Sequence, residues 1–141
     1  MATAINAEGW LKLLLRLFGG TAAVAIFPFV MPRSWMAVVH EWLGMGMLPD
    51  KPIVEYLARA TSALCAFYGF LLLLISMDVR RYRYVIAYQA GAMIILSAIG
   101  ALLGLRSGMP AWWMLGDAGS CWFYCGAMLL LQRRIPTAPG D

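Results

Sequence analysis

Asp117 is the residue whose type and position most strongly suggest chemistry in this chain. It lies about two helical turns inside an apolar segment that runs from residue 111 to residue 132. A carboxylate in hydrocarbon costs roughly 2.5–3.5 kcal/mol on insertion scales, so it should face protein and find a partner. We expect it to be buried between helices within salt-bridge reach of Arg59, the first choice, or Arg106. Its open roles are a structural ion pair, a polar pocket that opens outward, and snorkelling to water.

Other polar residues are expected on the same side of the molecule as Asp117. Glu55 precedes Arg59 by one helical turn and can pair with it. His40, the only histidine, stands next to Glu41. One histidine cannot supply two haem ligands, and zinc needs about three or four ligands, so no metal site is predicted. The candidate outer-side cluster comprises His40, Glu41, Glu55, Arg59, Arg106 and Asp117.

Cys121 and Cys125 are a possible redox pair, because they lie one helical turn apart. A redox dithiol normally has the spacing C-x-x-C at a helix start, where the helix dipole favours the thiolate. These two fall in the middle of an apolar segment instead, so we interpret them as small packing residues. No catalytic residue and no cofactor-binding residue is predicted, although a lipid or a quinone remains possible as a ligand.

The elements that position these residues are four apolar segments. Hydrophobic residues make up 62% of the 141 residues, against roughly 45–50% in soluble domains. Each segment has close to the ~20 residues that a spanning helix needs. We predict an all-α integral membrane protein, with one transmembrane domain over residues 1–141 and a bundle of four transmembrane helices at residues 11–31, 52–78, 84–105 and 111–132.

Residues 34–44, SWMAVVHEWLG, predict a short amphipathic helix between the first two spans. Ser34 can cap its start and Gly44 can end it. The segment is too short to cross a membrane but long enough to lie in the interface as an anchor. The alternative is a roof over a cavity, with His40 and Glu41 pointing inward. The apolar stripe consists of Trp35, Val38, Val39, Trp42 and Leu43.

The basic residues predict the orientation of the chain in the inner (plasma) membrane. Lysine and arginine are retained on the cytoplasmic side. One side carries seven of them next to helix ends: Lys12, Arg16, Arg80, Arg81, Arg83, Arg133 and Arg134. The other side carries four: Arg33, Lys51, Arg59 and Arg106. Both termini should therefore be cytoplasmic, and basic residues beside apolar segments indicate lipid headgroups as partners rather than nucleic acid.

Small residues predict where helices approach one another. Small side chains let two membrane helices come close. The third span contains the pattern G-x-x-x-G, and the fourth span has small residues one turn apart. The candidate packing residues are Gly100, Gly104, Gly116 and Ser120.

The layout resembles the DoxX-like group of small four-span membrane proteins. The matching pieces are SWMAVVHEWLG, EYLARATSALCAFYGFLLLL and DVRRYRY. The resemblance covers most of the chain and implies the same four-span fold. Some members of that group accompany quinone- or thiol-linked redox enzymes, but this chain has no C-x-x-C, and no catalytic residue is carried over.

Three classes of function are compatible with these features. The first is a non-catalytic accessory or structural subunit that packs against a larger membrane complex. It needs no catalytic set, and the sequence shows none, so we prefer it. The second is a DoxX-like redox protein linked to a quinone or to thiols. The third is a small carrier of a solute or lipid, although the internal repeats typical of carriers are missing.

Overall fold

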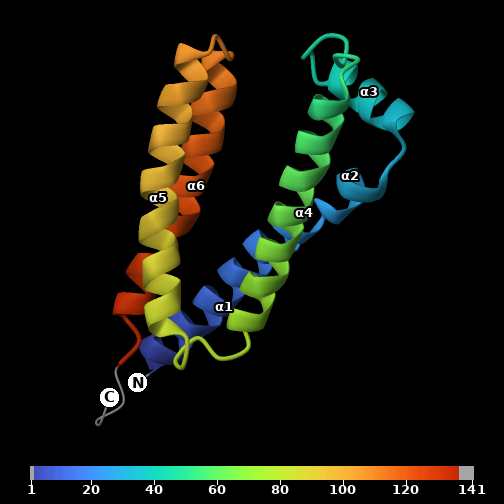
Figure 1. Cartoon of the computed structure of the whole chain (residues 1–141). Coiled ribbons are helices and arrows are strands. Elements are labelled where there is room, and N and C mark those ends of the chain that lie inside the picture. The colour runs from blue at the N-terminus through green and yellow to red at the C-terminus, as the bar shows by residue number, and fades with distance from the viewer. Residues whose placement is uncertain (1, 137–141) are drawn as a thin grey trace. The chain divides into compact units, whose positions relative to one another are not determined.

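The chain is helical throughout the part that the structure describes. A computed structural model describes residues 2–136, with side chains from residue 6 onward. The helices are α1 (Ala2–Ala23), α2 (Ile26–Val30), α3 (Arg33–Trp42), α4 (Pro52–Ile75), α5 (Arg83–Arg106) and α6 (Ala111–Arg133) (Figure 1). No strand occurs in residues 2–136. The all-α prediction is confirmed over this range.

Four helical segments are long and apolar enough to cross a membrane. They are Asn6–Val30, Pro52–Ile75, Arg83–Arg106 and Ala111–Arg133, with lengths of 23 to 25 residues. At about 1.5 Å per residue, each exceeds the ~30 Å of a hydrocarbon core. The chain is therefore that of a multi-pass membrane protein. The first segment begins at Asn6 rather than at the predicted residue 11, because helix α1 continues without a break back to Ala2.

The chain divides into two compact units. Unit 1 consists of residues 1–16 and 74–141, and unit 2 consists of residues 17–73. The boundaries fall inside α1 and inside α4.

Unit 1 is built around the antiparallel pair of α5 and α6 (Figure 1). Gly108 has a φ of +84° in the turn between them, a conformation that glycine adopts without a steric penalty. The amide of Gly108 donates to the carbonyl of Leu105, and the amide of Met109 to that of Gly104. These two bonds end α5 with a Schellman motif, which satisfies carbonyls that the helix leaves unpaired.

Small side chains form the core between α5 and α6. Ala90, Cys121 and Cys125 are buried together, with Met93, Ile94 and Leu129 packed against them. The indole of Trp122 on α6 donates hydrogen bonds to the Ser97 hydroxyl at 2.9 Å and to the Ile94 carbonyl at 3.2 Å, both on α5. A tight core and polar bonds between the helices hold this pair in register.

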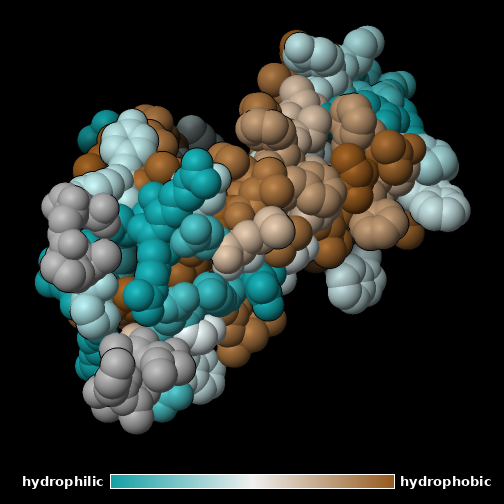
Figure 2. All heavy atoms as spheres, turned by 90° about the horizontal axis from the view of Figure 1, so that it is seen from below, coloured by the Kyte–Doolittle hydropathy of each residue, from teal (hydrophilic) through white to brown (hydrophobic). Residues whose placement is uncertain are grey.

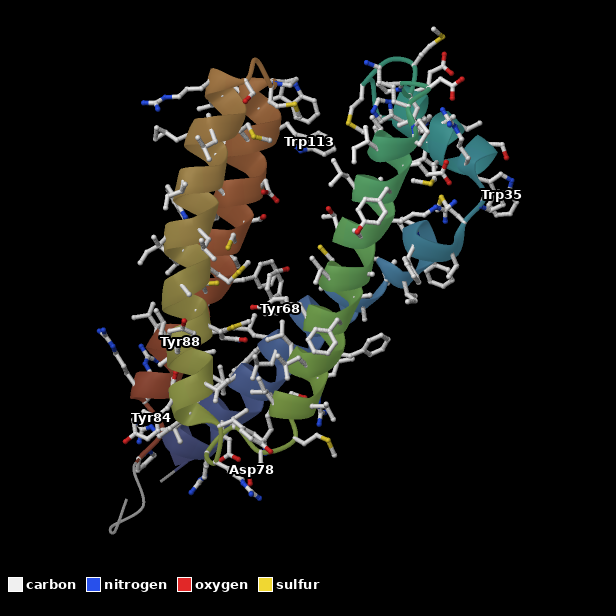
Figure 3. The ribbon with its side chains drawn as sticks, in the orientation of Figure 1. Trp35, Tyr68, Asp78, Tyr84, Tyr88 and Trp113 are labelled. Carbon is white, nitrogen blue, oxygen red and sulfur yellow. The ribbon has the colours of Figure 1, made fainter. Side chains whose placement is uncertain are left out.

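Polar contacts join the remaining elements of unit 1. Glu8 on α1 pairs with Lys12 at 2.9 Å and with Arg80, in the α4–α5 connection, at 2.8 Å. The side-chain amide of Gln132 donates to the backbone carbonyl of Arg83, which links the end of α6 to the start of α5. Figure 2 shows hydrophilic residues gathered over this end of unit 1. Aromatic residues mark both ends of the α5–α6 pair, with Tyr84 at this end and Trp113 at the other (Figure 3).

Unit 2 depends on a close crossing of α1 and α4. A methyl group placed on Gly69 would lie 2.6 Å from the carbonyl oxygen of Gly19 and 2.8 Å from the carbonyl carbon of Ala22. The backbones therefore touch where both helices carry glycine. The rings of Phe18 and Tyr68 meet edge to face beside the crossing, with their centroids 6.4 Å apart.

Helix α3 follows α2 through Pro32 and differs slightly from its predicted bounds. It spans residues 33–42 rather than 34–44, and Pro32, not Ser34, occupies the N-cap position without a side-chain cap bond. Gly44 ends the helix as predicted, with a φ of +75°. The amides of Gly44 and Met45 donate to the carbonyls of Glu41 and His40, which is again a Schellman motif.

Among the predicted packing residues, Gly104 has the close neighbour. A methyl group placed on it would overlap the sulfur of Met114 on α6. Nothing lies within 4 Å of such a methyl group on Gly100 or Gly116, and Ser120 is exposed. Gly69, where an added methyl group would meet the backbone of α1, was not predicted as a packing residue, because no G-x-x-x-G pattern surrounds it.

Candidate functional site

Arg59 is the centre of a polar network in unit 2. Its guanidinium donates to the Glu55 carboxylate at 2.9 Å and 3.0 Å. It also donates to the backbone carbonyls of Phe29 at 2.7 Å and Met31 at 3.1 Å. These carbonyls lie at the end of α2, where a helix leaves acceptors without partners. The planar fork of arginine can reach a carboxylate and two carbonyls together, so Arg59 fastens α4 to α2.

Arg33 extends this network to the chain segment before α4. It pairs with Asp50 at 2.7 Å and approaches Glu55 at 3.9 Å. Its guanidinium also donates to the carbonyl of Pro49 at 3.3 Å. From the sequence, Arg33 was predicted only to be one of the basic residues on the outer side, and its pairing with Asp50 was not predicted. The two residues pair because α3 folds back toward α4, and the spacing of residues in the sequence does not predict this fold.

His40 and Glu41 take no part in the network. The Nδ1 atom of His40 lies 2.8 Å from the carbonyl oxygen of Gly46, so the ring holds the loop after α3. Glu41 is exposed and forms no ion pair with any other described residue. This arrangement gives no support to the alternative in which both side chains point into a cavity.

Asp117 and Arg106 belong to unit 1, whereas the network around Arg59 belongs to unit 2. Contrary to expectation, the side chain of Asp117 is exposed. Arg106 is also exposed, and no salt bridge joins the two within the described residues. The buried residues of α6 all lie after Asp117 along the helix, from Ala118 to Gln132, so the start of α6 is left uncovered. Arg59, the first-choice partner predicted for Asp117, forms its salt bridge with Glu55.

A surface groove of about 330 Å³ surrounds Asp117 on α6. It is lined by Trp112, Trp113, Gly116, Asp117 and Ser120. The two indole rings meet edge to face, with centroids 5.4 Å apart. The hydroxyl of Ser120 donates to the backbone carbonyl of Asp117 at 2.9 Å, so it leaves the carboxylate unbound. The groove thus offers a carboxylate, aromatic edges and small residues on one side of a span.

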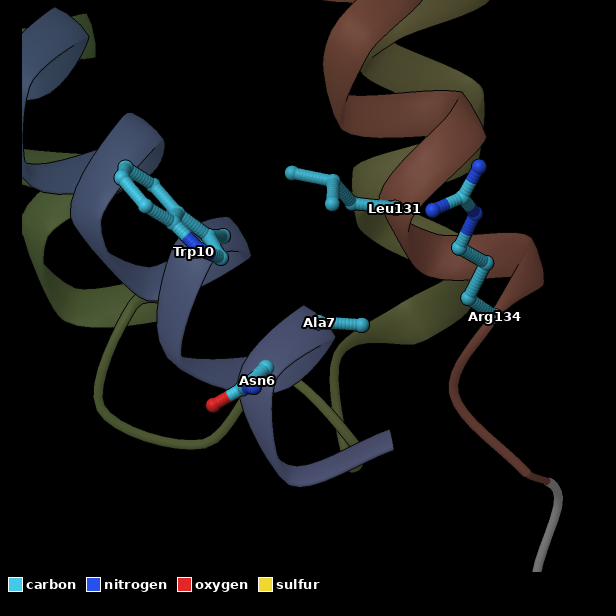
Figure 4. A pocket seen from close by; sticks show the side chains of 5 residues that line it. All are labelled: Asn6, Ala7, Trp10, Leu131 and Arg134. Carbon is cyan, nitrogen blue, oxygen red and sulfur yellow. The ribbon is translucent and has the colours of Figure 1, made fainter. Parts of the chain in front are cut away.

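A second hollow lies at the opposite end of unit 1, between the start of α1 and the end of α6. Its volume is about 480 Å³, and it is lined by Asn6, Ala7, Trp10, Leu131 and Arg134 (Figure 4). One wall is apolar, and Asn6 and Arg134 supply hydrogen-bond donors. This hollow was not predicted from the sequence, because its lining residues are far apart along the chain.

The thiols of Cys121 and Cys125 are neighbours, with sulfur atoms 3.9 Å apart. Both are buried, and Cys121 also lies 3.7 Å from the Met93 carbonyl oxygen on α5. Both thiols are buried against α5 and therefore contribute to the packing between the helices. This agrees with their interpretation as small packing residues. No group of three or more metal-binding side chains occurs in the described part of the chain.

Comparisons with known proteins identified no relative of this chain. No family model, curated protein or solved structure matches the chain. The resemblance to the DoxX-like group therefore stays a prediction from the sequence. The function has to be inferred from the groove, the hollow and the exposed faces of the helices.

Proposed function

We propose that the protein is a non-catalytic subunit of a larger membrane complex, which it joins through the groove around Asp117. The observation that carries the proposal is an exposed carboxylate on a helix apolar enough to cross a membrane. Facing lipid, that carboxylate would cost roughly 2.5–3.5 kcal/mol. A protein partner with a cation or a hydrogen-bond donor at the same depth removes this cost.

The shape of the groove supports a helix as the occupant. Gly116 offers open space above its backbone, and small residues let a neighbouring helix approach closely. Trp112 and Trp113 provide the aromatic surface that is enriched at protein contacts. The partner we propose is a spanning helix that carries Arg, Lys, Asn or Gln opposite Asp117, with small residues beside it.

Low burial of the spans also supports a subunit made mainly of contact surface. Only a minority of residues in the most apolar part of each span is buried inside the chain. In a membrane, packing and polar bonds between helices provide the association energy, rather than the hydrophobic effect. Wide apolar faces with one exposed carboxylate fit a chain that is completed by a partner.

The proposal includes a location for the protein and for α3. The termini lie on the cytoplasmic side of the inner (plasma) membrane, and α3 lies in the opposite interface. In support, Trp35 and Trp42 are 64% and 82% exposed, while Met36 is buried on the other face of α3. Exposed indoles next to a polar network are typical of residues at headgroup depth.

The test is co-purification from the native membrane in a mild detergent, read by native mass spectrometry. Wild-type protein should migrate with a partner of higher mass, and Asp117→Asn should lose that partner while remaining folded. Glu41→Gln removes an exposed acid that forms no ion pair with the described residues, and it should keep the partner. A wild-type protein that runs alone, with a melting temperature lowered by Asp117→Asn, would refute the proposal.

A further inference from the structure

The hollow between the start of α1 and the end of α6 combines a cation with an apolar wall. Arg134 and Asn6 line it together with Trp10, Leu131 and Ala7 (Figure 4). Within residues 6–136, the guanidinium of Arg134 forms no salt bridge. Its donors are therefore available to a ligand, and the volume of about 480 Å³ exceeds that of a few water molecules.

The surrounding charge favours an anion. Lys12 and Arg80 share the single carboxylate of Glu8, so the three groups together keep one positive charge. The other arginines of this end form no salt bridge with any described side chain: Arg16, Arg81, Arg83, Arg133 and Arg134. Concentrated positive charge raises the local concentration of anions. An arginine fork binds phosphate with two parallel hydrogen bonds, which a point charge cannot reproduce.

The apolar wall narrows the class of anion. Trp10, which is 59% exposed, and Leu131 both line the hollow. An amphipathic ring of this kind lies at headgroup depth in membrane proteins. A ligand that fills the hollow therefore has a phosphate for Arg134 and Asn6 and a carbon backbone for Trp10 and Leu131.

We propose that this hollow binds a glycerol phosphate group, supplied by the headgroup of an anionic phospholipid or by a free phosphate ester. The site is independent of the groove around Asp117, which lies at the other end of α6. Loss of one site therefore does not imply loss of the other.

The experiment measures binding of phosphatidylglycerol to the full chain in detergent by native mass spectrometry. Arg134→Gln should reduce the lipid-bound fraction at least about tenfold, since it removes a charge-assisted hydrogen bond. Arg133→Gln is the matched control, because it removes the same charge from the neighbouring residue, which does not line the hollow. It should reduce binding less than about threefold, as expected for an exposed charge that does not contact the ligand.

Three further arms test the hollow itself and separate the two sources of the phosphate group. Leu131→Trp fills the hollow without changing charge and should also reduce binding. Phosphatidylcholine should bind more weakly than phosphatidylglycerol. Glycerol 3-phosphate is then added as a competitor. If it displaces the lipid, and if its own binding is also lost in Arg134→Gln, the ligand is a free phosphate ester. If it does not displace the lipid, the ligand is the phospholipid. Equal losses in Arg133→Gln and Arg134→Gln, or full binding in Leu131→Trp, would overturn the proposal.

Discussion

At the scale of single residues, the charged side chains show how local pairing competes with function. Arg59 is satisfied by Glu55 one turn away and by two carbonyls of α2. Asp117 has no such neighbour and stands exposed on α6. The same physical rule, that a charge near hydrocarbon needs a partner, explains both. In Arg59 the partner is in the chain, and in Asp117 we propose that it is in another protein.

Arg59→Lys should lower the stability of the protein in detergent by about 1–2 kcal/mol, because lysine cannot serve a carboxylate and two carbonyls together. The value is set at the low end because the Arg59 side chain is 29% exposed. Thermal unfolding followed by circular dichroism is the measurement. Arg106→Lys, at an exposed position without a described ion pair, should leave the melting temperature unchanged. Equal effects at both positions would contradict the role of the network.

Sequence reasoning is successful for residues whose partners are close along the chain. It identified the pair of Glu55 and Arg59, because their spacing of four residues fixes the contact on any helix. It missed Arg33 with Asp50, which are brought together by a turn of the whole segment. It also expected a buried Asp117, because hydropathy gives depth in a membrane but not how far along α6 the burial by other helices extends.

At the scale of helices, glycine decides where elements can touch. Gly19 and Gly69 allow the backbones of α1 and α4 to meet. Gly104 accommodates Met114, whereas Gly100, on the same face one turn away, has no neighbour within 4 Å. A pattern of small residues predicts a smooth face, but the point at which another helix crosses it depends on packing along the entire helix.

Gly69→Ala should destabilise the protein by about 2–3 kcal/mol, near the upper end for overpacking, because the methyl group meets backbone atoms that cannot rotate away. Gly100→Ala is the control, since nothing lies within 4 Å of its added methyl group. We expect it to be neutral or slightly stabilising through helix propensity. The measurement is the melting temperature in detergent. A Gly69→Ala protein as stable as Gly100→Ala would show that α1 and α4 do not cross at this point.

Helix α3 should lie in the membrane interface with its exposed apolar face toward lipid. We expect an environment-sensitive fluorophore on Val38→Cys to emit at shorter wavelength in vesicles than the same probe on Glu41→Cys, because Val38 is on the apolar face. Both variants carry Cys65→Ala, which removes an exposed thiol. Identical spectra from the two positions would place α3 away from lipid.

At the scale of the whole molecule, the membrane spans could be predicted from hydropathy, but the packing of the helices could not. The four spans follow from segment length alone, and their bounds agree with the prediction to within a few residues except at the start of the first. The arrangement into two units was not predicted, because the boundaries fall inside continuous helices, α1 and α4, where composition does not change.

The orientation is a prediction for the whole chain. Green fluorescent protein, which is active in the cytoplasm, should be active when it is fused after Arg134. Alkaline phosphatase, which is active outside the cytoplasm, should be active when it is inserted at Gly46, in the exposed loop after α3. The physical reason is retention of the seven basic residues beside the helix ends. The reverse pattern would contradict the orientation.

The central claim, that another protein covers the groove around Asp117, is tested most directly by photo-crosslinking in the native membrane. A photoreactive amino acid at Ser120 lies in the groove, and the same group at Leu96 lies on an exposed part of α5. Illumination should join Ser120 to a second membrane protein and give a discrete band of higher mass, while Leu96 gives no such band. Lipid adducts alone at Ser120, or the same bands from both positions, would contradict the claim.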